Sequence, residues 1–143
     1  MNLEIYEILE KAAAAPTRVE KIEVLKKYNS LGLRDILRAA YDDSIVFTLP
    51  PGVPEYQSHV SNEGMAPSSL QRKTKMMTYF VKRGQGDSLP AIKRERIFLQ
   101  ILEGIHPKDA EILIAAKEKK LNGKFKGITK NLIKEVWPKL IEV

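Results

Sequence analysis

The stretch SLPAIKRERIFLQILEG, residues 88–104, decides the fold class that we predict. Ser88 or Asp87 caps it, Pro90 lies in its first turn, where a missing N–H costs little, and Gly104 ends it. The residues between these limits are apolar nearly all round a helix: Ile97, Phe98, Leu99, Ile101 and Leu102. A helix that is apolar on every side is buried. We therefore expect this stretch to be the central helix of an all-α domain.

Helical spacing and end signals predict six to seven short helices in one compact domain. Besides the central helix, the predicted ranges are about 3–15, 17–28, 33–41, 68–83, 107–120 and 129–137. Asn2 is a plausible N-cap for the first, and Thr17 with Glu20 forms a capping-box pattern for the second. Leu121-Asn122-Gly123 is a helix C-terminal signal.

Residues 42–67 have no helical period and separate a helical part (1–41) from a second helical part (68–143). Pro50, Pro51 and Pro54 argue against a helix and against a central strand, while residues 44–49 favour a short extended piece. A connection this long in a small domain is either functional or partly disordered.

Charge is divided unevenly along the 143 residues, whose net charge is +6. Residues 1–66 carry 7 Lys+Arg and 10 Asp+Glu, a net −3, whereas residues 67–143 carry 17 and 8, a net +9. This asymmetry favours an anionic partner, although a charged surface also serves solubility alone. The chain has no cysteine, which excludes disulfides, thiolate metal sites and a cysteine nucleophile.

The sequence gives no sign of a membrane span or a secretory signal. No apolar run approaches the roughly 18 residues of a membrane helix, and the first residues lack a basic start followed by an apolar region. We therefore expect an intracellular protein without a membrane partner.

Candidate catalytic and metal-ligating residues are few. His59 lies in a polar stretch and His106 precedes Pro107 at a helix start, where capping or packing is the favoured role. Asp42-Asp43 is more consistent with helix termination than with cation binding. We predict no metal site, no cofactor and no catalytic constellation.

A lysine-rich loop between the last predicted helices is the best candidate for phosphate contacts. Its cations are Lys117, Lys119, Lys120, Lys124, Lys126 and Lys130. Phe125, between two of them, either stacks on a base or anchors the loop to the core. Secondary contacts come from two further predicted helices, whose basic faces would form one patch with the lysine-rich loop if the helices packed antiparallel. These residues are Arg72, Lys73, Lys93, Arg94 and Arg96.

The Pro-rich segment, Leu49–Tyr56, is the candidate for a protein partner, because extended Pro-rich chain is ordered before docking. Its predicted contact residues are Leu49, Pro50, Pro51, Gly52, Pro54 and Tyr56.

Several segments, in order and over nearly the whole chain, resemble a small protein family of large tailed phages, cyanophages included. They are Leu33–Asp42 (LRDILRAAYD), Leu49–Tyr56 (LPPGVPEY), Leu102–Ala110 (LEGIHPKDA), Ala116–Leu121 (AKEKKL), Ile128–Ile133 (ITKNLI) and Trp137-Pro138. That family has no assigned activity, so no site residues carry over. The resemblance implies a phage accessory protein in the cytoplasm of a bacterial host.

Two functions follow as hypotheses. The first is a non-catalytic protein that binds DNA or RNA through its basic C-terminal half. The second is an adaptor or inhibitor that binds a host or phage protein through the Pro-rich segment. A virion-associated structural role is a further alternative.

Overall fold

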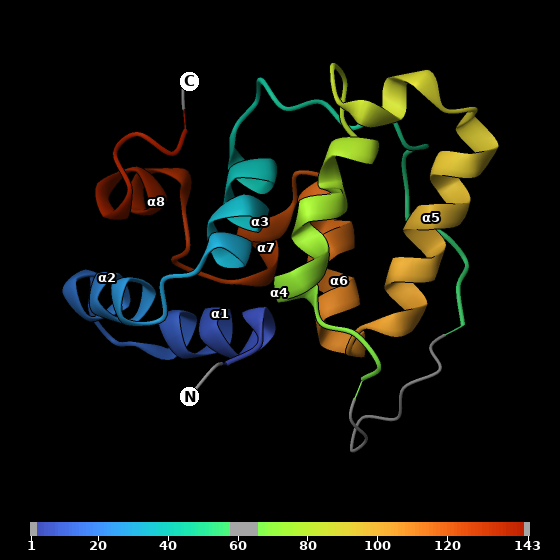
Figure 1. Cartoon of the computed structure of the whole chain (residues 1–143). Coiled ribbons are helices and arrows are strands. Elements are labelled where there is room, and N and C mark those ends of the chain that lie inside the picture. Colours follow the sequence, from blue (N-terminus) through green and yellow to red (C-terminus); the bar gives the residue numbers. More distant parts are fainter. Residues whose placement is uncertain (1–2, 58–65, 142–143) are drawn as a thin grey trace.

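Helix α6 lies at the centre of an all-α fold (Figure 1). The computed structural model describes residues 3–57 and 66–141. Its helices are α1 (Ile5–Ala14), α2 (Arg18–Lys27), α3 (Leu31–Tyr41), α4 (Leu70–Lys73), α5 (Ala91–Gly104), α6 (Pro107–Lys117), α7 (Leu121–Lys124) and α8 (Lys130–Val136), with 3-10 turns η1 (Thr74–Tyr79) and η2 (Gln85–Ser88). The all-α prediction is therefore confirmed.

The prediction that residues 88–104 form the central helix is wrong. Helix α6 contacts α1, α3, α5 and α7, whereas α5 stands at the edge of the fold in Figure 1. Small residues such as Ala110 and Ala116 are fully buried in α6 and let neighbouring helices approach it closely. In α5 only Phe98, Ile101 and Leu102 are buried, and Ile92 is 73% exposed.

Side-chain caps fix several helix starts where the sequence predicts them. Thr17 accepts a hydrogen bond from the backbone N–H of Glu20 at 3.2 Å, and Thr129 accepts one from Leu132 at 3.2 Å. Helix α1 begins after Glu4, which is its N-cap. The predicted cap Asn2 lies outside the described residues. The cap predicted for α5 at Asp87 or Ser88 is wrong, because those residues belong to η2 and α5 begins after Pro90.

The prediction of a single helix over residues 68–83 is also wrong, because α4 ends at Lys73 and the 3-10 helix η1 begins at Thr74. Residues 80–82 pair instead with the extended piece 46–48, through Thr48 N–H to Phe80 O (2.7 Å) and Lys82 N–H to Val46 O (2.8 Å). This confirms the short extended piece predicted there. The turn that follows needs glycine, because a Cβ at Gly86 would lie 1.8 Å from Tyr79 O.

Helix α6 ends earlier than predicted, at Lys117. Lys119 adopts a φ of 58°, in the left-handed region, while Lys120 N–H donates to Ala115 O at 2.9 Å. This is the hydrogen-bond pattern of a Schellman motif with lysine in the place that glycine usually takes. The predicted C-terminal signal at residues 121–123 lies inside α7.

The first and last parts of the chain pack together. Helix α2 contacts α8, where Arg18 pairs with Glu135 at 3.0 Å. The buried Tyr41 hydroxyl donates to Ile128 O at 2.5 Å, and burial raises the pKa of that phenol. These contacts position the end of α3, from which the irregular segment departs.

Candidate functional site

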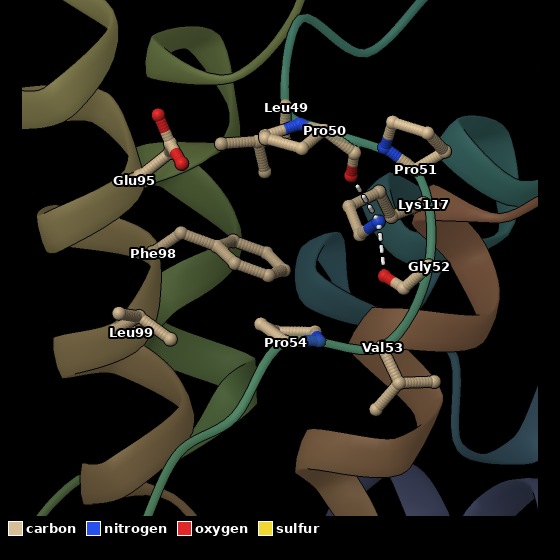
Figure 2. A pocket seen from close by; sticks show the side chains of 10 residues that line it. All are labelled: Leu49, Pro50, Pro51, Gly52, Val53, Pro54, Glu95, Phe98, Leu99 and Lys117. Carbon is tan, nitrogen blue, oxygen red and sulfur yellow. Dashed lines mark hydrogen bonds between the residues drawn. The ribbon is translucent and has the colours of Figure 1, made fainter.

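The Pro-rich segment runs between the middle of α5 and the end of α6, where the Lys117 ammonium holds it (Figure 2). Lys117 is 7% exposed, and its Nζ donates to Pro50 O and Gly52 O, each at 2.9 Å. It also forms an ion pair with Glu118. An ammonium group has three N–H donors, so these three acceptors use all of them.

Glu118 completes the attachment of the segment. One carboxylate oxygen pairs with Lys117, and the other accepts the Gly52 N–H at 2.9 Å. The Lys117 hydrogen bond, opposed by burial and aided by the Gly52 N–H, lowers the pKa of Glu118. Prolines have no N–H and the segment joins no sheet, so its carbonyls depend on side-chain donors. The last turn of α6 supplies them.

Lys119 holds the start of the irregular segment in the same way. Its Nζ donates to Ala39 O and to Asp42 O, the latter at 3.0 Å. Burial lowers the pKa of Lys119, against the raising effect of Asp43 and Asp42. The left-handed backbone of a lysine costs about 1 kcal/mol, which these two hydrogen bonds offset.

A small apolar cavity, the Phe98 pocket, opens between the Pro-rich segment and α5. It has a volume of about 220 Å³ and is lined by residues 49–54, Glu95, Phe98, Leu99 and Lys117. Glu95, Phe98 and Leu99 share one face of α5 because they are three and four residues apart. Figure 2 shows the Phe98 ring extending from α5 toward the segment, with Glu95 one turn before it.

A shallower hollow of about 540 Å³ lies on the other side of Val53. It brings Gly52 and Tyr56 of the Pro-rich segment together with Lys120 and Lys124 of the lysine-rich loop. The two candidate sites that the sequence separates therefore meet on one surface. Lys124 also pairs with Glu111 at 3.2 Å.

Four residues predicted to contact nucleic acid have internal roles instead. Lys117 and Lys119 bond backbone carbonyls, as described above. Arg94 does the same, since its Nη1 donates to Gly86 O at 3.0 Å and to Leu89 O at 2.8 Å. Phe125 is 7% exposed and packs in the core, so it anchors the loop rather than offering a ring to a base.

The other predicted cations lie on several elements and loops of the fold. Lys120 and Lys126 are exposed, and Lys130 pairs with Asp43 at 3.4 Å. Arg72 lines a hollow beside Glu4, away from the lysine-rich loop. Lys73 lies on α4, while Lys93 and Arg96 lie on α5. The bond from Ser68 N–H to Gly104 O, at 3.0 Å, joins the start of α4 to the end of α5, and Figure 1 shows the two running antiparallel.

Three pocket residues, Glu95, Phe98 and Leu99, are functional candidates that the sequence analysis missed. In the sequence, Glu95 lies among the cations Lys93, Arg94 and Arg96, and Phe98 belongs to the apolar interior of its predicted helix. Their spacing at three and four residues indicates that they share one face of a helix. The surface opposite that face is the irregular Pro-rich segment, and the sequence of such a segment has no periodicity that would predict the contact.

His106 caps α6, as predicted. Its Nδ1 accepts from the Lys108 backbone N–H at 3.1 Å, and its ring stacks on Tyr6 with centroids 4.4 Å apart. His59 lies outside the described residues. Within residues 3–57 and 66–141, no cluster of three His, Asp or Glu side chains could hold a metal ion. None of the helices in those ranges is long and apolar enough to cross a membrane.

Fold and site together define an all-α protein that carries a Pro-rich segment on its surface, attached by the buried Lys117. The chain belongs to DUF6433, a family of unknown function whose model matches residues 8–123. No curated protein matches it significantly.

Proposed function

We propose that this chain is a small non-catalytic binding protein that recognises a protein partner through the Pro-rich segment. The observation that carries the proposal is the exposure of Val53, which is 74% exposed although the residues around it are fixed. Lys117 and Glu118 hold the backbone at Pro50 and Gly52. The Phe98 pocket and the shallower hollow lie on the two sides of this part of the segment.

Such a surface suits docking for an entropic reason. Ordering a loop on binding subtracts from affinity, and a segment already fixed in extended form avoids that cost. Exposed apolar side chains beside small cavities also provide anchor points for a partner. The resemblance to a phage family supports a role as an accessory protein in an infected bacterium, with a host or phage protein as the partner.

Photo-crosslinking tests the proposal. Val53 is replaced by p-benzoylphenylalanine, and the full chain is irradiated in a bacterial lysate treated with nuclease. The matched control carries the same group at Val19, on α2, which is 65% exposed and lies outside the Pro-rich segment. The captured protein is then purified and its binding to the unmodified chain is measured directly.

We expect one protein to be captured from Val53 and not from Val19, and to bind the unmodified chain. Addition of Lys117→Met should weaken the adduct, because the segment is then no longer held. Equal capture from both positions, or no binding by the purified protein, contradicts the proposal.

A second candidate, nucleic-acid binding, is favoured by the net charge of +9 in residues 67–143 and by the exposure of Lys120 and Lys126. A titration of labelled DNA and RNA over a range of salt concentrations tests it. The double variant Lys120→Ala/Lys126→Ala should reduce the slope of log K against log salt by about one to two. The exposed pair Lys11 and Lys26 provides the matched control. Binding that is absent at low salt or indifferent to salt contradicts this candidate.

A further inference from the structure

We propose that the Phe98 pocket takes an arginine or lysine side chain of the partner protein, with the apolar stem inside and the charged head at Glu95. The inference rests on the proposed function, since it names the chemistry of the residue that anchors the partner. It is argued from the size, the lining and the charge of the pocket.

The size of the pocket indicates that its occupant is a single side chain of the partner protein. Its volume of about 220 Å³ falls below the roughly 300–1,000 Å³ that sites for small molecules and cofactors occupy. The cavity is bounded on one side by the Pro-rich segment, which a partner docked on Val53 would reach at the same time.

The lining selects an apolar stem. Leu49, Pro54, Phe98 and Leu99 line the cavity with hydrocarbon. Lysine and arginine bury their methylene chains along such surfaces while the head stays near water or an acid. A guanidinium also packs favourably against an aromatic ring such as that of Phe98.

The charges of the residues that line the pocket favour a positively charged occupant. Only two charged residues line the pocket, Glu95 and Lys117. Lys117 has no donor left, and its charge is paired with Glu118. Glu95 makes no hydrogen bond or ion pair within residues 3–57 and 66–141 and is partly exposed. It is therefore the lining group with acceptors to offer a ligand.

Other occupants fit less well. An acidic side chain would be repelled by Glu95 and would find no free donor on Lys117. A wholly apolar side chain would remove water from the Glu95 carboxylate without replacing its hydrogen bonds, which costs free energy.

The test uses the ¹⁵N-labelled full chain and three small probes. They are N-acetyl-arginine methylamide, the citrulline analogue, which has nearly the same shape without charge, and the norleucine analogue, which keeps only an apolar stem. Amide shifts of Gly52, Val53 and Phe98 report binding at the pocket. The titrations are repeated on Glu95→Gln and on Glu23→Gln, a matched change at an exposed glutamate of α2.

We expect the arginine probe to bind about tenfold more tightly than the citrulline probe, because citrulline can hydrogen-bond the Glu95 carboxylate but lacks the attraction between the guanidinium and carboxylate charges. The preference should disappear in Glu95→Gln and persist in Glu23→Gln. Equal binding of arginine and citrulline, a preference that survives Glu95→Gln, or no shifts at the pocket each overturn the inference. Crosslinking at Val53 decides the proposed function separately from these outcomes.

Discussion

Replacement of the buried Asp109 by asparagine should make the protein more stable at neutral pH and leave it unchanged in acid. Asp109 is fully buried at the start of α6, and its Oδ1 accepts the Tyr6 N–H of α1 at 2.9 Å. Burial raises its pKa to about 7, the Tyr6 N–H opposes this, and the charges of Glu4 and Glu7 add to it.

The sign and size of the effect follow from proton linkage. In the unfolded chain the pKa of an aspartate is about 4. Between about pH 4 and about pH 7 the folded protein binds the proton more tightly than the unfolded chain, so stability falls as pH rises through this window. The difference between the ordinary pKa of 3.8 and about 7 corresponds to about 4 kcal/mol. An asparagine side chain at this position would accept the same Tyr6 N–H through its amide oxygen without titrating.

Urea denaturation of the wild type and Asp109→Asn at several pH values measures this. The gain in unfolding free energy should grow from acid to neutral pH by about 4 kcal/mol and then stay constant. Other carboxylates cancel in the difference, and Glu23→Gln serves as a control that should show no such trend. A gain that is independent of pH refutes the reasoning.

Three further substitutions test the packing that positions the site. Gly86→Ala should destabilise by about 1–3 kcal/mol, because the new Cβ would lie 1.8 Å from Tyr79 O; a neutral effect in thermal unfolding would contradict the close approach. Phe125→Ala should cost about 3–5 kcal/mol, as expected for a core aromatic, whereas an exposed ring would cost far less in the same assay. Lys117→Met should cost about 3 kcal/mol, because it leaves the Glu118 carboxylate and two carbonyls of the Pro-rich segment without their donor; an unchanged free energy of unfolding would show that Lys117 does not hold the segment.

Local signals in the sequence predict much of the helical fold. Thr17 and Thr129 mark helix starts that the structure confirms, because capping depends on residues within one turn. The extended piece near residue 47 is also recognisable, since its lack of helical period and the prolines that follow it are local features. These predictions do not require knowledge of the neighbouring elements.

The central helix could not be identified in this way. The helix α5 is apolar on several faces, yet part of its apolar surface faces the irregular segment, and Ile92 faces solvent. The helix α6 contains more alanine and no aromatic residue, and its small side chains are what allow four helices to surround it. Burial of this kind depends on tertiary packing, which periodicity does not report.

The lysine-rich loop shows that the candidate site, too, could not be predicted fully from local sequence patterns. Six lysines near one another predict a basic patch, but Lys117 and Lys119 point inward because backbone carbonyls elsewhere in the chain need donors. For Lys117 the need arises from the Pro-rich segment, more than sixty residues earlier, and for Lys119 from the carbonyls of Ala39 and Asp42 at the end of α3. The sequence contains both halves of this arrangement, and only the fold shows that they belong together.

The affinity of the chain for the protein captured at Val53 tests the central claim most directly. The measurement is titration calorimetry with the wild type, Val53→Asp and Val19→Asp, two aspartates placed at similarly exposed positions. If the Pro-rich segment is the docking surface, Val53→Asp should weaken binding by about tenfold or more and Val19→Asp should leave it nearly unchanged. Equal affinities for all three proteins would contradict the account.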